Sequence, residues 1–194
     1  MKIVKYVSIV ILLAILTACG GGQKSESESA DGSTDAAEAT NSKATAVLGP
    51  ANNSGVSGTV SFEQIGEEVV KMTVQAMHIS PGTHALHLHE NGDCSAPDAS
   101  SAGGHWNPTA MPHGKRGEGD FHKGDIINLE ASADSVVNWS SEINGWTIGG
   151  PVETNIVGRS VIIHVAADDF TSQPSGNAGS RVACGVINEE GGSM

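Results

Sequence analysis

The chain has 194 residues, carries a formal net charge of −12 and contains 25 glycines but only 4% aromatic residues. This length allows one domain of ordinary size with extra segments at its ends. The acidic charge counts against nucleic acid as a partner, because binding to phosphates requires a basic surface. Any anionic substrate would need positive charge close to its site.

Residues 1–18 are typical of an export signal. Two lysines form a short basic region, and the ten residues that end at Leu16 are apolar apart from one serine. That run is shorter than the roughly 20 residues that span a membrane. The Leu-Thr-Ala-Cys segment that ends at Cys19 is similar to the lipobox of bacterial lipoproteins, whose cysteine is lipidated and becomes the new N-terminus. We therefore expect a lipoprotein signal peptide; an ordinary cleaved signal peptide or a membrane anchor helix is the alternative.

Residues 19–43 consist mainly of Gly, Ser, Ala, Thr and acidic residues, with almost nothing apolar. Such a segment cannot bury enough surface to offset the entropy of ordering, so we expect a flexible acidic tether. Together these features predict an exported protein that is anchored in a membrane through lipid on Cys19 and faces the periplasm or the cell exterior. Its folded domain would cover residues 44–194.

Short runs of alternating apolar and polar residues predict eight strands. They cover residues 44–48, 55–63, 68–78, 84–90, 126–131, 136–139, 160–165 and 181–188. A turn joins the second and third as a hairpin. Residues 91–124 show neither strand nor helix period, and a loop this long is unusual in a compact domain unless it is functional. No convincing amphipathic helix is present, so the pattern predicts an all-β fold, an antiparallel barrel or sandwich.

Three cysteines are present: Cys19, Cys94 and Cys184. If Cys19 carries lipid, one pair remains, and export permits a disulfide between Cys94 and Cys184. Two free buried thiols are the alternative. A link between residues 90 apart would stabilise the fold by about 4–5 kcal/mol in the chain-entropy model.

All eight histidines lie between His78 and His164. His87 and His89 are two apart in a predicted strand, so their side chains project from the same face, about 6.5–7 Å apart. Two imidazoles in this arrangement can bind one metal ion, although the pattern alone also fits a polar strand face. His164 ends an apolar strand, where a single histidine is usually a packing residue. With His87 and His89 it becomes a candidate third ligand.

The long loop contributes a second candidate set: His105, His113, His122 and Asp125, separated by eight, nine and three residues. Three imidazoles and one carboxylate make the closed four-coordinate set that structural zinc prefers. A chance grouping in a polar loop is the alternative. The Gly and Pro content of the loop favours the ion, because it permits tight wrapping.

These residues belong to motifs that follow one another in a defined order: His87-Leu88-His89-Glu90-x-Gly92-Asp93, Gly104-His105-x-Asn107-Pro108, His113-Gly114, His122-x-Gly124-Asp125, Gly158-Arg159, His164, Asp168-Asp169, and Gly176-Asn177-Ala178-Gly179-Ser180-Arg181-x-x-Cys184-Gly185-Val186-Ile187. From about residue 44 to 190, this order and spacing resemble the copper–zinc superoxide dismutase family. The resemblance implies an eight-stranded antiparallel Greek-key barrel or sandwich with two long functional loops.

The resemblance also assigns two metal sites. The residues that match the copper ligands are His87, His89, His105 and His164, and those that match the zinc ligands are His105, His113, His122 and Asp125. His105 would then bridge both ions as an imidazolate, which is plausible only between two cations.

Further roles follow from the same resemblance. Asp168 matches a carboxylate that links a copper ligand to a zinc ligand and fixes the orientation of both rings. Arg181 matches the cation beside copper, where it would attract superoxide. Cys94 and Cys184 match the family disulfide. Copper would take an electron from one superoxide and give it to a second, yielding dioxygen and hydrogen peroxide, while His105 carries a proton and zinc stays redox-silent.

The chain departs from commoner members at several positions. Residues 170–175 form a short loop without the Lys and Glu that eukaryotic members use for steering, so the chain is similar to the bacterial branch. Asp125 precedes Ile-Ile-Asn, where small residues or Pro are usual, which bears on how the zinc loop ends. His84 matches a histidine that hydrogen-bonds between loops, and His78 matches nothing functional. A homodimer stays open, because the interface differs between branches.

Two other functions are alternatives to the enzyme. A non-catalytic lipoprotein could store or deliver copper or zinc, since related domains lose copper ligands and survive as binding modules. This chain keeps the complete ligand set and Arg181, which favours the enzyme. A zinc hydrolase would need an open coordination position and a general base, and the sequence has no His-Glu-x-x-His motif.

Overall fold

The computed structural model describes residues 42–191 of the chain. The predicted signal peptide, the predicted lipidation site Cys19 and nearly all of the predicted tether lie outside these residues. In the part described, no helix is long and apolar enough to cross a membrane.

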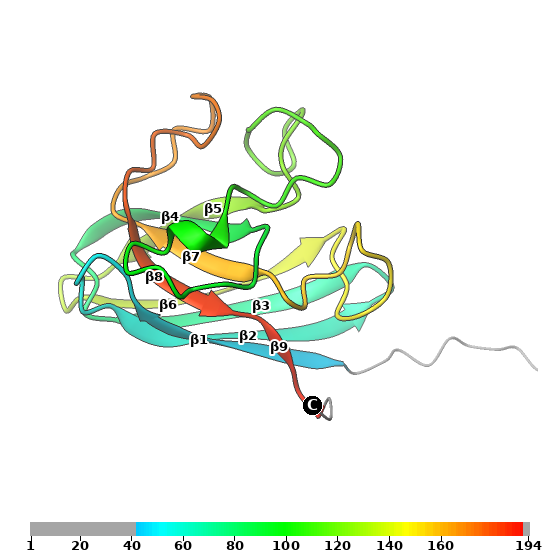
Figure 1. Ribbon diagram of the computed structural model, residues 1–194, viewed down its shortest axis with the longest axis horizontal. Coiled ribbons are helices and arrows are strands. Elements are labelled where there is room, and N and C mark those ends of the chain that lie inside the picture. Colours follow the sequence, from blue (N-terminus) through cyan, green and yellow to red (C-terminus); the bar gives the residue numbers. More distant parts are fainter. Residues whose placement is uncertain (1–41, 192–194) are drawn as a thin grey trace, which may run out of the picture. The chain divides into compact units, whose positions relative to one another are not determined.

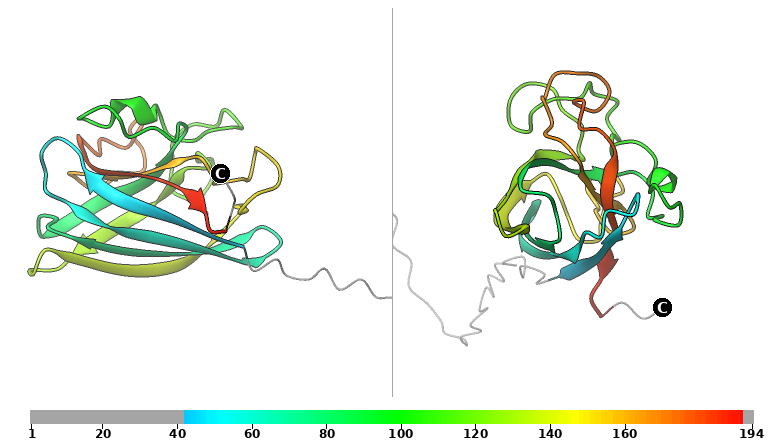
Figure 2. Two further views of the ribbon diagram at one scale, coloured as in Figure 1. Left: turned by 60° about the horizontal axis from the view of Figure 1, so that its bottom comes forward. Right: turned by 90° about the vertical axis from the view of Figure 1, so that its left-hand side faces the viewer.

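The described residues form nine strands and one short 3-10 helix, η1 (Ser100–Ala102). The strands are β1 (Lys43–Pro50), β2 (Ser57–Gly66), β3 (Val69–Met77), β4 (Gly82–His89), β5 (Asp125–Ala131), β6 (Val136–Asn144), β7 (Ser160–His164), β8 (Arg181–Val186) and β9 (Asn188–Glu189). They join in the order β5-β4-β7-β8-β1-β2-β3-β6, and β9 pairs with β1. Every pairing is antiparallel. The sheet curls until β5 and β6 meet, giving a nearly closed barrel (Figures 1 and 2).

The predicted all-β class is confirmed, and β2 and β3 form the predicted hairpin. The eight predicted strands are present, except that the last, over residues 181–188, is divided into β8 and β9. The prediction ended β6 at residue 139, whereas the strand runs to Asn144. Residues 140–144 are mostly polar, but their backbone continues the ladder with β3, pairing Ser141 with Met72 and Ile143 with Val70. Cross-strand pairing therefore extends this strand beyond its apolar pattern.

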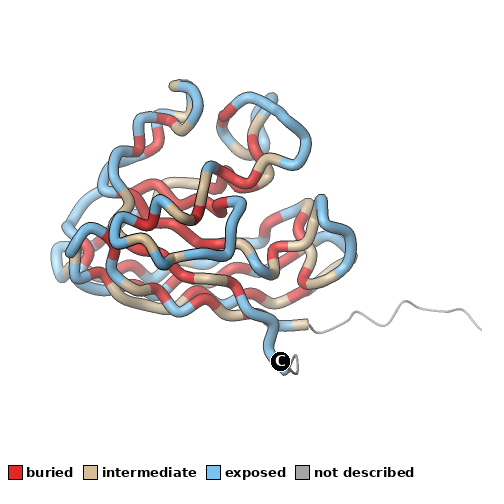
Figure 3. The backbone as a smooth tube through the Cα atoms, in the orientation of Figure 1, coloured by how far each residue is buried: buried red, intermediate tan, exposed pale blue. Residues whose placement is uncertain are grey.

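Burial in the barrel alternates along most strands, as expected for a sheet with one wet face. In β2, for example, Val60 and Phe62 face the core while Ser61 between them is exposed (Figure 3). Strands β4 and β7 differ, because His84–His89 and all of β7 are buried on both faces. Something other than the barrel core must therefore cover the outer face of these two strands.

Two long connections provide this cover. Residues 90–124 and 165–180 rise from the same side of the barrel, above β4, β7 and β8 and away from β2 and β3 (Figures 1 and 2). The outer face of β4 and β7 is consequently an interior surface, although its side chains do not belong to the apolar core.

Candidate metal centre

Strand β4 separates its apolar and imidazole side chains onto opposite faces. Leu86 and Leu88 pack into the barrel core, so His87 and His89 point outward, beneath the loops. His164 ends the neighbouring β7 at a register shift, and its ring centroid lies 5.1 Å from that of His87. The structure thus brings together three histidines from two adjacent strands.

The long loop is fastened to β4 through its backbone. The Trp106 amide donates to the Leu88 carbonyl (2.9 Å), the Leu88 amide donates to the Gly124 carbonyl (2.8 Å), and the Gly124 amide donates to the Trp106 carbonyl (2.8 Å). A Cβ on residue 124 would overlap the Leu88 oxygen, so only glycine fits. This three-way contact holds His105, before Trp106, and the turn from His122 to Asp125 against the outward histidines.

The first cluster consists of His87, His89, His105 and His164, all buried, and one nitrogen from each ring lies within 4.8 Å of the others. His87 Nδ1 and Nε2 of His89, His105 and His164 are buried and have no hydrogen-bond partner among the described residues. Leaving a buried polar atom without a partner is costly, and four such atoms in one place fit a shared cation. Imidazole nitrogens suit copper and zinc.

The opposite nitrogens in the first cluster are held by oxygen atoms. His87 Nε2 donates to Asp168 Oδ2 (2.8 Å), His89 Nδ1 to the Gly103 carbonyl (2.9 Å) and His164 Nδ1 to the Gly179 carbonyl (3.1 Å). These contacts fix the proton on one nitrogen of each ring and leave the lone pair of the other free for a metal.

The second cluster consists of His105, His113, His122 and Asp125. Its nitrogen and oxygen atoms are close: the Asp125 carboxylate lies 2.7 Å from His105 Nδ1, 3.0 Å from His113 Nδ1 and 3.2 Å from His122 Nδ1. The Nδ1 atoms of His105 and His122 are 3.4 Å apart. Three imidazoles and a carboxylate around one point are the donor set of a closed zinc site.

His105 belongs to both clusters, with Nε2 in the first and Nδ1 in the second. Its ring centroid lies 3.9 Å from that of His87 and 5.5 Å from that of His122. One imidazole therefore lies between two groups of candidate ligands.

Asp168 links a histidine of the first cluster to a histidine of the second. Its two carboxylate oxygens accept hydrogen bonds from His87 Nε2 (2.8 Å) and His113 Nε2 (2.9 Å). Gly176, at φ +64°, packs against this carboxylate so closely that a Cβ would overlap Asp168 Oδ1. Asp168 thus lies between His87 and His113, the linking position expected for it. Gly176 of the same loop packs against its carboxylate.

Two side-chain amides outside the predicted site residues hold the same region. Asn128 Nδ2 donates to the Asp168 carbonyl (2.9 Å) and Asn128 Oδ1 accepts from the Asp168 amide (2.8 Å). Likewise, Gln173 Nε2 donates to the His113 carbonyl (2.8 Å) and Gln173 Oε1 accepts from the His113 amide (2.9 Å). The unusual Ile-Ile-Asn segment after Asp125 therefore places an amide that anchors Asp168. A sequence pattern could not reveal either contact, since both are to backbone atoms distant in the chain.

Burial keeps the strand histidines neutral. It lowers the pKa of His87 to about 4 despite the hydrogen bond to Asp168, that of His89 to about 2 and that of His164 to about 3. Metal ligands must be deprotonated, so these rings are ready to bind at neutral pH.

The second cluster is mixed, because burial lowers the pKa of His122 as it does in the first cluster, whereas hydrogen bonds decide the pKa of His113 and of the carboxyl groups. Burial would lower the pKa of His113, but hydrogen bonds to Asp125 and Asp168 outweigh it and raise the pKa to about 9. Burial would raise the pKa of Asp125 and Asp168, but hydrogen bonds from histidines hold both well below the ordinary value. The carboxylates of Asp125 and Asp168 therefore favour a positive charge at the second cluster, either a proton or a metal ion.

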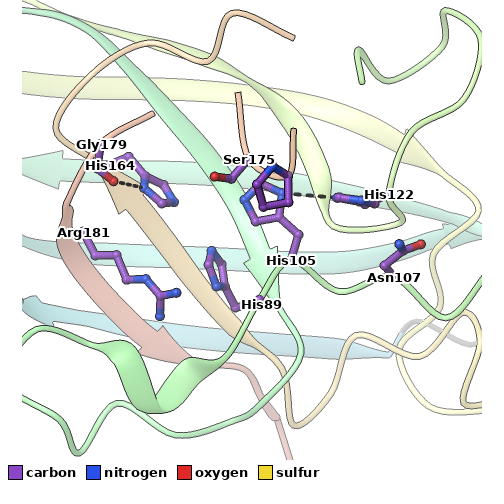
Figure 4. Close-up of a pocket in the computed structure, with 10 residues that line it drawn as sticks. His89, His105, Asn107, His122, His164, Ser175, Gly179 and Arg181 are labelled. Atoms are coloured by element: carbon purple, nitrogen blue, oxygen red, sulfur yellow. Dashed lines mark hydrogen bonds between the residues drawn. The ribbon is translucent and has the colours of Figure 1, made fainter. Parts of the chain in front are cut away.

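A cavity of about 430 Å³ opens onto the first cluster, and His89, His105 and His164 line it. Among the described residues around it, Arg181 alone has a permanent positive charge. Figure 4 shows Arg181 on the same side of the pocket as His89 and His164, with His122 beyond His105. The guanidinium donates to the carbonyls of Ala99 and Gly103, and the Gly103 carbonyl also holds His89.

The predicted disulfide is present: Cys94 is bonded to Cys184, with their Cα atoms 5.8 Å apart. It links β8, three residues after Arg181, to the loop whose carbonyls hold Arg181. The disulfide therefore ties this cation and its supporting carbonyls into one unit.

The two remaining histidines lie outside both clusters. The ring nitrogens of His84 lie 2.8 Å from the carbonyl oxygens of His164 and Ser80, so His84 joins the end of β7 to the segment before β4. His78 is exposed, with Nδ1 3.5 Å from Ser57 Oγ.

A comparison with protein-family models agrees with this geometry. The model described as Copper/zinc superoxide dismutase (SODC) matches residues 56–187, which include both clusters, Arg181 and the disulfide. The chain belongs to the copper/zinc superoxide dismutase family. Members of this family bind copper and zinc, and the two histidine clusters have donor sets that fit these ions.

Proposed function

We propose that the protein is a copper–zinc superoxide dismutase, which converts two superoxide anions and two protons into dioxygen and hydrogen peroxide. The observation that carries the proposal is the complete first cluster, in which His87, His89, His105 and His164 each direct an unpartnered nitrogen toward one point beside Arg181. A storage or delivery module needs ligands but has no use for an anion-attracting group at the mouth.

The two clusters divide the metals by donor type. The first cluster, with imidazoles only, would hold copper, and the second, which includes Asp125, would hold zinc. When bound, copper supplies one-electron oxidation and reduction, and zinc supplies charge and fixed geometry without redox chemistry. The rings of the first cluster are kept in their orientation by hydrogen bonds to Gly103, Gly179 and Asp168. These rings would therefore move little when the charge of a bound copper ion changes.

His105 and Arg181 are the residues we assign to the reaction itself. Nε2 of His105 faces the first cluster and can hold a proton whenever it is not a ligand, so it can supply one of the two protons that peroxide requires. Arg181 lines the open cavity and offers the local positive charge that an anion needs in an acidic protein. In this scheme Arg181 attracts and orients superoxide, and Ser175 and Asn107 line the approach.

Removing one ligand of the first cluster tests the enzymatic proposal. We expect His164→Ala to abolish superoxide removal by the copper- and zinc-loaded protein while zinc binding and the fold are retained, because His164 contributes to the first cluster only. Stopped-flow decay of superoxide measures the rate, and metal analysis measures occupancy. His78→Ala is the matched control, since His78 is exposed and outside both clusters. Full activity in His164→Ala, or none in the wild-type protein loaded with both metals, would contradict the proposal.

Reversing the charge at the mouth tests Arg181. We expect Arg181→Glu to lower the second-order rate constant by about 10–100-fold at low ionic strength and by less at high ionic strength, because salt screens the repulsion. Arg181→Lys should retain much of the rate. Lys115→Glu, the same reversal at an exposed position outside the cavity, is the control. A rate for Arg181→Glu equal to that of the control at every salt concentration would remove Arg181 from the mechanism.

We further propose that the protein works outside the cytoplasm as a lipoprotein anchored through Cys19, where it would protect the cell envelope from superoxide. The basic and apolar composition of residues 1–18, the Leu-Thr-Ala-Cys segment and the acidic tether support this location. A disulfide between Cys94 and Cys184 is also consistent with an oxidising compartment.

Cys19→Ser tests the anchor. Loss of the thiol removes the attachment point of the lipid, whose burial in a membrane is worth about 0.8 kcal/mol per methylene group. We expect wild-type protein in the membrane fraction with a mass that includes lipid, and Cys19→Ser protein without that mass. Identical masses and identical fractionation of the two proteins would rule out lipidation at Cys19.

A further inference from the structure

Arg116 is a charged residue of the long loop that neither the ligand sets nor the cavity uses. It lies in the segment that joins His113 to His122, two residues of the second cluster. Its guanidinium carbon sits 5.0 Å from the centre of the Phe121 ring and 5.1 Å from that of Trp146. Trp146 is fully buried and belongs to the core, so the cation packs against two aromatic rings at the edge of the core.

The donors of Arg116 point at backbone carbonyls around the second cluster. Nε donates to the Asp125 carbonyl (2.6 Å), one terminal nitrogen donates to the Lys123 carbonyl, and the other donates to the Asn144 carbonyl (3.1 Å). Asp125 and Lys123 flank Gly124, the residue whose backbone docks the turn against Leu88 and Trp106. Asn144 ends β6.

These contacts surround the turn that carries two ligands of the second cluster. The backbone of Gly124 is bonded to that of Leu88 and Trp106, and the carbonyls of the residues before and after Gly124 accept hydrogen bonds from Arg116. Trp146 Nε1 adds a hydrogen bond to the same Lys123 carbonyl (2.9 Å). Two sets of hydrogen bonds therefore hold the turn, and the Arg116 guanidinium joins it to β6 and to the segment that follows His113.

We propose that Arg116 is a positioning residue for the second cluster. By fixing the turn from His122 to Asp125, it holds the His122 ring and the Asp125 carboxylate in the geometry that a tetrahedrally coordinated divalent cation requires. The inference rests on the proposed function in taking this cluster as the zinc site. It concerns metal affinity and geometry, not the redox step.

The guanidinium is specifically suited to this role. Its donors lie in one plane and reach three carbonyls at once, and its flat faces pack on aromatic rings. A lysine ammonium is a point charge on a flexible stem, so it could keep the charge but not the three directed bonds together with the ring contacts. Arg116→Lys therefore separates the effect of charge from that of geometry.

The test uses the full-length protein and cobalt(II), whose visible absorption reports the geometry of a site that zinc would fill. Affinity is measured by competition with a chelator, the fold by circular dichroism and the thermal midpoint by calorimetry. Lys115→Gln is the matched control, because it removes one positive charge from the adjacent position, where the side chain only pairs with exposed Glu118. If Arg116→Lys fails to fold, Arg116→Gln replaces it.

We expect Arg116→Lys to bind cobalt(II) about 10–100-fold more weakly, the usual cost of losing a group that orients ligands, with altered visible bands. Lys115→Gln should match the wild type in both. A lower thermal midpoint with wild-type affinity and bands would show that Arg116 only stabilises the fold, and would overturn the inference. If the wild type binds cobalt(II) but does not remove superoxide, the proposed function fails while the inference on Arg116 stands.

Discussion

The structure depends on the convergence of six buried imidazoles and two buried carboxylates on the outer face of β4 and β7. Nitrogen lone pairs face one another across the first cluster without a hydrogen-bond partner in residues 42–191, and a carboxylate lies among three rings in the second. Without cations the lone pairs of the first cluster would remain uncompensated, which is costly, whereas the carboxylate of the second cluster would depend on hydrogen bonds from histidines and on a proton on His113. The free energy of metal binding is therefore coupled to the geometry of both loops, and His105 makes the two sites interdependent.

The barrel contributes rigidity and a face with alternating side chains. Because β4 sends Leu86 and Leu88 inward, it must send His87 and His89 outward, and no loop rearrangement can change that relation. The loops contribute the remaining ligands and are tied back at few but specific points: Gly124 to the backbone of β4, Asp168 to His87 and His113, and the disulfide to β8. Ligands on strands and ligands on loops thus meet at one rigid surface.

Much of this arrangement was predictable from the sequence, for identifiable reasons. Period-two alternation located the strands, and the order of motifs predicted which histidines would meet. The clusters, the position of Asp168 and the disulfide agree with that prediction. The supporting contacts could not be predicted, because they link side chains to backbone carbonyls and amides far away in the chain. Asn128, Gln173 and Arg116 have no spacing signature, and β6 extends past its apolar pattern because β3 pairs with it.

The central claim is that one imidazole, His105, separates two metal ions of different kinds. X-ray diffraction from crystals of the copper- and zinc-loaded protein, recorded at the absorption edges of both metals, tests it most directly. We predict one copper peak among His87, His89 and His164, and one zinc peak among His113, His122 and Asp125, with His105 between them. A single peak, the same metal at both positions, or a peak bound to residues outside these clusters would contradict the account.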